Sequence, residues 1–331
     1  MTASRLASTL ERLVGAKLPA FVWGPPGIGK SSIVSQVAES LGVEFLDLRL
    51  ALLDPTDLKG IPFFDPESRQ GVWAPPSFLP TDPKSRGILF LDEINSAPPA
   101  VQASAYQLVL DRKVGEYELP EGWSIVAAGN RENDRGVVYR MPPPLANRFV
   151  HLELEVELSE WKRWAYGAGV SAEVIGYLSF EPERLFAFDP QSGEKAFPTP
   201  RSWSFADRML RSGLESEALL EAVAGAVGRE AAVGLMSFLQ VRERLPDPER
   251  LLAGEEVEID EDPRVLTLLV SALAQRAAAD PGLLDRVLEL SMELPGEFAV
   301  MLVRELQSLG LEMEESEVWE QWVERFSFLL E

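Results

Sequence analysis

Residues 24–31 read Gly24-Pro25-Pro26-Gly27-Ile28-Gly29-Lys30-Ser31 and match the pattern G-x-x-x-x-G-K-[ST]. An apolar run at 20–23 precedes this stretch, and an amphipathic helical pattern that includes Ile33 and Val37 follows it. Glycines allow the backbone to curl so that successive N–H groups point at phosphate oxygens, and a helix N-terminus adds the positive end of its dipole. We therefore predict a strand, a phosphate-binding loop and a helix, in that order.

Two side chains of this loop have distinct expected tasks. Lys30 is expected to reach the β- and γ-phosphates of a nucleotide, and the Ser31 hydroxyl to bind Mg²⁺. The nucleotide-binding segment is expected to run from Gly24 through Ser32. The chain has no N-K-x-D pattern for reading guanine, so we expect the nucleotide to be ATP.

The first 150 residues alternate apolar runs with helical patterns. The apolar runs are 20–23, 43–50, 87–91, 124–128 and 149–154, and helical patterns occupy 30–40 and 98–110. This alternation predicts an α/β fold, a parallel sheet flanked by helices. From about residue 158 the pattern is helical, with a turn-rich acidic connector at 245–263. We predict three domains, a nucleotide-binding domain at 1–157, a helical domain at 158–245 and an acidic helical extension at 246–331.

The charge is unevenly distributed. The chain has 31 Lys or Arg and 53 Asp or Glu residues, a net charge of -22, and the excess lies almost entirely after residue 150. A strongly acidic surface repels phosphate backbones, which disfavours nucleic-acid binding. A solvated helical surface and a basic protein partner both explain such a charge. No apolar run reaches the roughly 18 residues of a membrane-spanning helix, and the absence of cysteine agrees with a cytoplasmic protein.

Polar residues follow two of the predicted strands. Asp92 and Glu93 come directly after the strand at 87–91. There Asp92 can hold Mg²⁺, directly or through water, and Glu93 can polarise the attacking water as a general base. The strand at 124–128 leads to Asn130, whose amide could orient that water, although it also suits a simple turn residue.

Arg148 ends a short helical segment that follows three prolines. A fixed guanidinium can stabilise the charge that develops on a phosphoryl group during transfer, although an arginine there also suits a helix C-terminus. Arg135 and Arg140 are close enough in sequence to take the same role. His151, the single histidine, lies in the following apolar strand, where we expect a structural role. Without cysteine, a zinc site lacks the usual three protein ligands.

Together these residues resemble the AAA+ superfamily of ATPases and, within it, the MoxR group of the helix-2-insert branch. The resemblance covers about residues 18–210. It identifies 24–31 as the Walker A loop, Asp92-Glu93 as the Walker B pair and Asn130 as sensor 1. It also identifies Arg148 as the finger that enters the nucleotide site of a neighbouring subunit.

The same resemblance implies further parts. Thr199-Pro200-Arg201 is similar to the Ser-Pro-Arg of sensor 2, whose arginine contacts the γ-phosphate from a helical lid, with Thr199 in place of the usual serine. The family's inserted hairpin is expected at about 57–78, and a second hairpin before sensor 1 at about 112–120. Asn147 stands where the family often has Asp before the finger arginine.

The function implied by this resemblance is ATP hydrolysis with Mg²⁺ by a homo-oligomeric ring, expected to be a hexamer. Such a ring would act as a chaperone-like remodeller, activator or metal-insertion helper for a protein client, with a partner that bears a von Willebrand factor A domain. Two alternatives remain open. One is a DNA-directed motor or restriction-type NTPase, and the other is an ATP-gated regulatory adaptor with little turnover.

Overall fold

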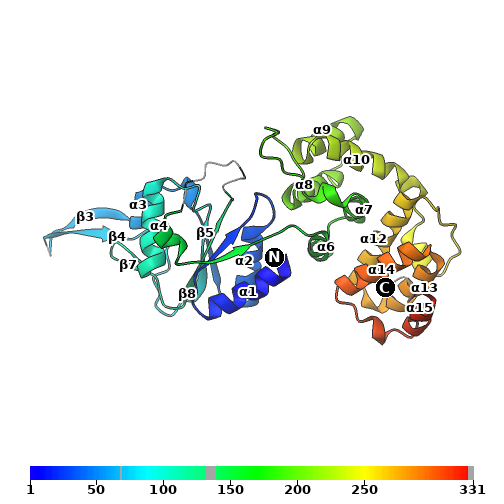
Figure 1. Ribbon diagram of the computed structural model, residues 1–331, viewed down its shortest axis with the longest axis horizontal. Helices are drawn as coiled ribbons and strands as arrows, with labels where there is room; N and C mark the ends of the chain where they lie inside the picture. Colours follow the sequence, from blue (N-terminus) through cyan, green and yellow to red (C-terminus); the bar gives the residue numbers. More distant parts are fainter. Residues whose placement is uncertain (68, 132–133, 135–138, 140, 327–331) are drawn as a thin grey trace. The chain divides into compact units, whose positions relative to one another are not determined.

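The computed structural model describes residues 1–331 except 68, 132–133, 135–138, 140 and 327–331 (Figure 1). The chain forms two compact units, Met1–Val156 and Glu157–Glu331. The predicted segments 158–245 and 246–331 both fall in the second unit, so their separation into two domains stays a prediction.

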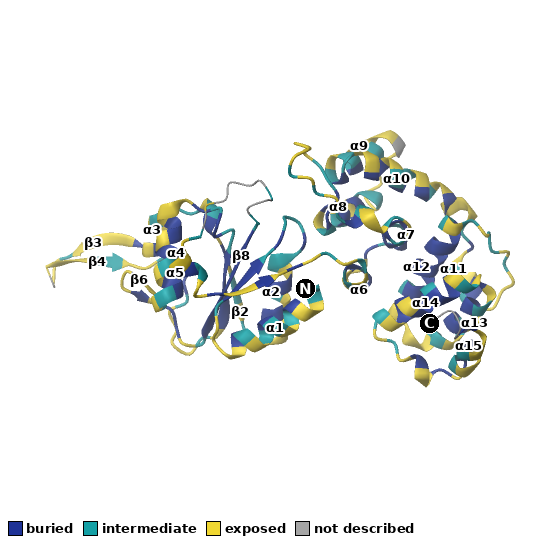
Figure 2. Cartoon of the chain, viewed as in Figure 1, coloured by how far each residue is buried: buried dark blue, intermediate teal, exposed yellow. Residues whose placement is uncertain are grey.

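The first unit is built on a five-stranded parallel sheet with the strand order β2-β5-β8-β1-β9. The strands are β1 (Ala20–Trp23), β2 (Glu44–Arg49), β5 (Gly87–Asp92), β8 (Trp123–Gly129) and β9 (Val150–Glu153). Each strand lies at one of the five predicted apolar runs, which confirms the predicted fold class. The central strands β5 and β8 are buried along almost their whole length, as expected for a parallel sheet covered on both faces (Figure 2).

Helices cover both faces of this sheet. Helices α1 (Ala3–Gly15) and α2 (Lys30–Ser40) pack together on one face, where Ser124 of β8 donates a hydrogen bond to the Val14 carbonyl. Helix α4 (Pro99–Asp111) covers the other face and buries Val101, Ala105 and Leu108 against Leu89 and Leu91 of β5. This core holds the carboxyl ends of β1, β5 and β8 at one edge of the sheet, the edge where parallel sheets bind ligands.

Two hairpins leave this unit. Helix α3 (Pro55–Lys59) leads into the antiparallel pair β3 (Ile61–Asp65) and β4 (Gln70–Ala74), which extends away from the sheet in Figure 1. Gly60 begins the hairpin with a φ of 86°, and a Cβ there would lie 1.9 Å from the Ala74 carbonyl oxygen, so only glycine fits. The pair β6 (Lys113–Val114) and β7 (Tyr117–Glu118) forms the second hairpin. Both hairpins lie within the segments predicted to contain them.

The second unit is helical in the part of the chain that the structure describes. Its helices are α6 (Leu158–Gly167), α7 (Ala172–Phe180), α8 (Pro200–Leu210), α9 (Ser216–Val227), α10 (Arg229–Leu239), α11 (Pro248–Leu252), α12 (Pro263–Ala279), α13 (Leu284–Glu293), α14 (Gly296–Ser308) and α15 (Trp319–Phe326). Helix α12 is buried along most of its length and packs against α7 and α14. It starts sharply because Asp262 accepts a hydrogen bond from the Arg264 N–H and Pro263 occupies the first helical position.

A buried ion pair ties the start of this unit to its end. Lys162 of α6 lies with Nζ 2.6 Å from Oε1 of Glu305 on α14, and the hydroxyl of Tyr166 donates to the same carboxylate. Burial, together with the Glu305 charge, raises the pKa of Tyr166 well above its ordinary value, so that this hydroxyl stays a donor. The predicted lid and the predicted extension therefore share a core. Within the described residues, no helix combines the length and the apolar character needed to cross a membrane.

Candidate nucleotide-binding and hydrolysis site

The phosphate loop joins the end of β1 to the start of α2. Gly27 and Gly29 have φ values of 80° and 93°, in the left-handed region where a side chain is strained. A Cβ on Gly29 would meet nothing within 4 Å, so backbone conformation rather than space calls for glycine there. The first turn of α2 leaves its N–H groups without intrahelical partners, and such groups bind phosphate.

The other predicted loop residues line the same turn. Pro25, Pro26 and Ser31 are half-buried, Ser32 is exposed on the first turn of α2, and Ile28 is buried. A Cβ on Gly24 would lie 2.6 Å from Cδ1 of Ile28, so the loop closes against its own start. The apolar side chain of Ile28 is thus turned into the protein, and the loop presents its backbone and polar groups to a ligand.

Lys30 ties the loop to the neighbouring strand. Its ammonium donates to the carbonyl oxygens of Gly24 at 2.6 Å and Pro25 at 2.9 Å, and to Oδ1 of Asn130 at 3.0 Å. Asn130 follows β8, which pairs directly with β1. The structure thus brings together the predicted phosphate-binding lysine and the predicted water-orienting amide.

Asp92 is the last residue of strand β5 and Glu93 follows it, so that their carboxylates lie near each other and near the carboxylate of Asp47. Burial raises the pKa of Asp92, and the charges of Asp47 and Glu93 raise it further, against the opposing effects of Lys30 and the Glu93 N–H. Glu93 has a φ of 56°, and its N–H donates to Oδ1 of Asp92 at 2.9 Å. Non-glycine residues rarely take this backbone conformation, and where they do the site is often functional.

Asp47 was not singled out from the sequence. It lies on β2, in register with Phe90 of the adjacent strand β5, and therefore on the same face of the sheet as Asp92. Desolvation raises the pKa of Asp47, Arg49 opposes this, and the charge of Glu93 adds to it. An acidic residue among apolar neighbours in a predicted strand was the available signal, but the sequence does not say which strands are neighbours.

Asn95 is a second residue that sequence reasoning gave no role. Asn95 is 2% exposed, and its side-chain Nδ2 donates to the backbone carbonyl of Asn130 at 2.7 Å. The backbone carbonyl of Asn95 accepts from the Tyr139 N–H, also at 2.7 Å. A Cβ at Gly129 would lie 2.2 Å from Oδ1 of Asn95, so the amide fits only beside glycine. Asn95 therefore braces the turn after β5 against the turn that carries Asn130.

The donor set near the loop suits Mg²⁺. Ser31 offers a hydroxyl and Asp92 a carboxylate, which are the hard oxygen ligands that Mg²⁺ takes in proteins. Among the described residues, no group of three or more His, Cys, Asp or Glu side chains is arranged to hold a metal. This fits an ion held by one or two protein ligands together with substrate phosphates and water.

Two further site residues predicted from the sequence are the arginines Arg148 and Arg201. Arg148 follows the short helix α5 (Pro143–Ala146) and its C-cap Asn147; it is exposed, and no described residue forms an ion pair or a side-chain hydrogen bond with it. The competing Arg135 and Arg140 lie outside the described residues. Arg201 belongs to the second unit, so its contact with the γ-phosphate stays a prediction.

Arg201 lies in the first turn of α8 and is exposed. Thr199 is the N-cap of this helix, accepting from the Ser202 N–H at 3.0 Å, while its own N–H donates to Oγ of Ser202 at 2.8 Å. The threonine that replaces the family's serine therefore performs the capping that a serine would perform.

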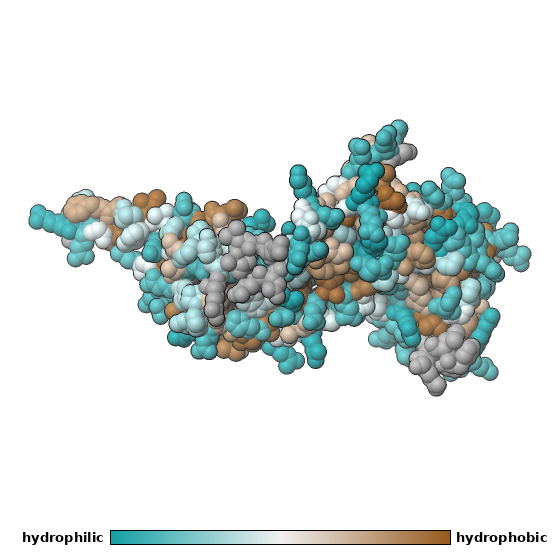
Figure 3. Space-filling view, turned by 45° about the horizontal axis from the view of Figure 1, so that its top comes forward, coloured by the Kyte–Doolittle hydropathy of each residue, from teal (hydrophilic) through white to brown (hydrophobic). Residues whose placement is uncertain are grey.

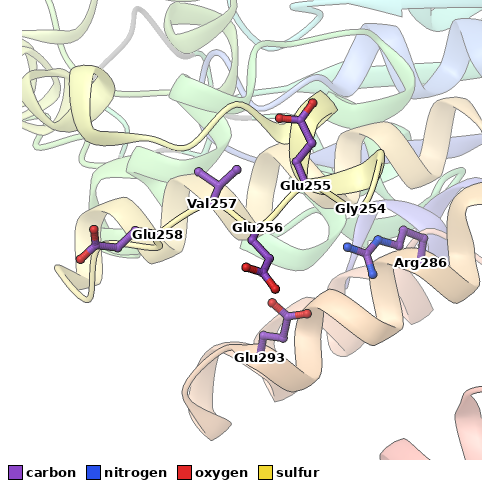
Figure 4. Close-up of a pocket in the computed structure, with 7 residues that line it drawn as sticks. All are labelled: Gly254, Glu255, Glu256, Val257, Glu258, Arg286 and Glu293. Atoms are coloured by element: carbon purple, nitrogen blue, oxygen red, sulfur yellow. The ribbon is translucent and has the colours of Figure 1, made fainter.

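The second unit also has an acidic pocket of about 460 Å³, shown in Figure 4. The carboxylates of Glu256 and Glu293 face each other across it, and Arg286 is its single cation. That guanidinium already donates to the Leu251 carbonyl at 2.9 Å and pairs with Glu289 at 2.8 Å. The pocket therefore keeps a negative potential, which repels phosphate groups.

Comparison with known proteins agrees with this geometry. Residues 20–151 match the ATPase family associated with various cellular activities (AAA). The peroxisomal Lon protease homolog 2 of Arabidopsis thaliana is 31% identical over 148 residues, which are 40% of this chain and 15% of that protein. The chain thus spans a small part of that relative.

Two solved structures are similar at low identity. The RuvB Holliday junction branch migration motor of Thermotoga maritima is 18% identical with a TM-score of 0.39, covering 84% of this chain and 83% of that one. NtrX of Brucella abortus in complex with ADP is 15% identical with a TM-score of 0.42, covering 93% and 68%. Neither similarity bears on function.

The sheet and its phosphate loop define the first unit as a P-loop nucleotide-binding domain. The match to the AAA family of ATPases covers residues 20–151, which include this loop, and it supports ATP as the nucleotide of this domain.

Proposed function

We propose that this chain is a ring-forming AAA+ motor of the MoxR type that hydrolyses ATP to remodel a protein client. The proposal rests most on Arg148, which is exposed and unpaired among the described residues of its own subunit. A guanidinium in this state can enter the site of a neighbour, where it would stabilise charge on the transferred phosphoryl group. Hydrolysis would then depend on assembly.

Within one subunit, the described residues have separable tasks in hydrolysis. The backbone N–H groups of residues 27–32 and the Lys30 ammonium bind and orient the phosphates. Glu93 accepts the proton of the attacking water, and Asn130 orients that water. Mg²⁺, held by Ser31 and Asp92, would neutralise charge on the β- and γ-phosphates. Arg201 would add a γ-phosphate contact from the second unit.

Protein rather than nucleic acid is the favoured client, on two grounds. The hairpin β3–β4 exposes Ile61, Phe63 and Phe64 by 69%, 52% and 65%, and apolar surface is visible along it in Figure 3. Exposed apolar residues on a projecting element mark a protein-binding surface. The second unit is strongly acidic, which disfavours phosphate backbones. A partner with a von Willebrand factor A domain, and a hexameric ring, follow from the family resemblance.

The test is the ATPase rate per subunit against protein concentration, with light scattering on the same samples in ATP. For the wild type we expect a rate that rises with assembly. Arg148→Ala should keep the assembled mass and lose about 10³-fold or more in rate. Arg12→Ala, which removes an exposed charge from α1, is the matched control and should behave as wild type. A rate independent of concentration and unchanged in Arg148→Ala would contradict the proposal, and stimulation by DNA that salt abolishes would favour the DNA-directed alternative.

A further inference from the structure

His151 connects two segments that flank the nucleotide machinery. The indole N–H of Trp23 donates to Nδ1 of His151 at 2.9 Å, and Nε2 of His151 lies 2.8 Å from the Ala146 carbonyl oxygen. An indole nitrogen can only donate, so Nδ1 must accept. The proton of the neutral imidazole is therefore on Nε2, which donates to Ala146.

Both partners lie beside residues of the proposed mechanism. Trp23 is the last residue of β1, and the phosphate loop begins with the next residue. Ala146 is the last residue of α5, two positions before Arg148. One imidazole thus bonds the strand that enters the phosphate loop to the turn that presents the arginine.

Aromatic packing helps to hold the imidazole in place. The rings of Trp23 and His151 are nearly parallel, with centroids 5.9 Å apart and an interplanar angle of 22°, and Trp23 stacks on Phe21 with centroids 4.1 Å apart. Phe21 belongs to the buried core of the sheet. The orientation of His151 is therefore set by the rigid sheet as well as by its two hydrogen bonds.

We propose that His151 is a positioning residue that sets the direction of Arg148 relative to the phosphate loop of its own subunit. This inference rests on the proposed function, because Arg148 acts there in the site of a neighbour. Displacing a reacting group by about 1 Å can lower a rate about 100-fold. Loss of His151 therefore lowers turnover in assembled protein and leaves ATP binding unchanged, because the phosphate loop keeps its own contacts.

Two substitutions separate the two hydrogen bonds. His151→Gln places an amide N–H near the position of Nε2 and keeps the bond to Ala146, whereas His151→Asn keeps an acceptor near Nδ1 and loses that bond. We expect His151→Asn to lower kcat about 10- to 100-fold with an unchanged KM for ATP and unchanged assembled mass. His151→Gln should recover most of kcat. Val150→Thr, on the opposite face of the same strand, is the control and should match wild type.

The tautomer of His151 can also be measured by NMR, without reference to turnover. His151 is the only histidine, so an imidazole ¹⁵N spectrum of the full chain reports on this residue alone. We expect the Nε2–H tautomer, and a shift of the Nδ1 resonance in Trp23→Phe, which keeps a stacked ring and removes the donor. An Nδ1–H tautomer, a His151→Asn variant with wild-type kcat, or loss of assembly in that variant would each overturn the inference. If the proposed function were wrong, the ATPase rate per subunit of the wild type would not change with assembly. The imidazole ¹⁵N spectrum would still show the Nε2–H tautomer.

Discussion

The ammonium of Lys30 lies 3.0 Å from Oδ1 of Asn130, which joins the phosphate loop to the end of β8. The same ammonium donates to the carbonyls of Gly24 and Pro25. To reach phosphate oxygens, Lys30 must exchange some of these contacts, and release of Asn130 would free its amide to orient a water. If Lys30 and Asn130 have the proposed roles, this one hydrogen bond would link ATP binding to the placement of the attacking water.

Asn130→Ala tests this link. We expect kcat for ATP hydrolysis to fall about 100-fold, the usual effect of losing one positioned polar group, while the Kd for ATP changes little because the loop and Lys30 remain. Steady-state kinetics and a nucleotide titration measure the two quantities. Gln107→Ala removes an exposed amide from α4 of the same unit as a control. A variant with unchanged kcat would show that Asn130 is only a turn residue.

The raised pKa of Asp92, to which Asp47 contributes, predicts how the stability of the fold depends on pH. Because the pKa of Asp92 is raised in the folded chain, protonated Asp92 stabilises the fold; this contribution is complete below its ordinary pKa of 3.8 and is lost as pH rises through the raised value. Asp47→Asn removes a charge that raises this pKa. The variant should therefore lose less stability than wild type as the pH rises from about 4 through the raised pKa of Asp92.

Urea unfolding of nucleotide-free protein across this range measures the effect. Asp111→Asn, at the end of α4 on the other face of the sheet, is the matched loss of charge. Equal pH dependence in Asp47→Asn and wild type would mean that the two carboxylates do not interact.

The buried pair in the second unit makes a stability prediction. Lys162 and Glu305 have side chains only 13% and 3% exposed, so Lys162→Met leaves an uncompensated buried charge and should cost about 3–5 kcal/mol of unfolding free energy. Adding Glu305→Gln, which keeps an acceptor for Tyr166, should recover much of that loss. Arg242→Met breaks an exposed pair with Glu173 in the same unit and should cost less than about 1 kcal/mol. Denaturant titrations measure these unfolding free energies. Similar losses of unfolding free energy for Lys162→Met and Arg242→Met would contradict a buried, compensated charge pair between Lys162 and Glu305.

The β3–β4 hairpin makes a prediction about clients. Phe63 and Phe64 point to opposite faces of the hairpin and are both exposed, so replacing both with serine should leave the fold and the basal ATPase rate intact. Stimulation of the wild-type ATPase by an unstructured protein such as casein should be lost in this double variant. Leu18→Ser, an exposed apolar residue outside the hairpin, is the control. Equal stimulation of the double variant and wild type would place client contact elsewhere.

Much of the fold could be predicted because the sequence patterns that specify it each lie within one short segment of the chain. The strand–loop–helix unit around Lys30 is specified by local periodicity and by glycines whose φ values other residues rarely take. The same holds for the apolar run that ends in Asp92 and Glu93. These segments carry their structural preference within a few residues, so no knowledge of distant partners is needed.

Contacts between distant segments were decided by the tertiary structure alone. The approach of Asp47 to Asp92 depends on β2 lying beside β5, and the bond from Trp23 to His151 depends on β9 lying beside β1. Hydrophobic periodicity shows which residues are buried, but it is the same for every order of the strands. Strand order is set by packing of the whole sheet against its helices. Only this packing brings Asp47, Asn95 and His151 next to the residues of the site.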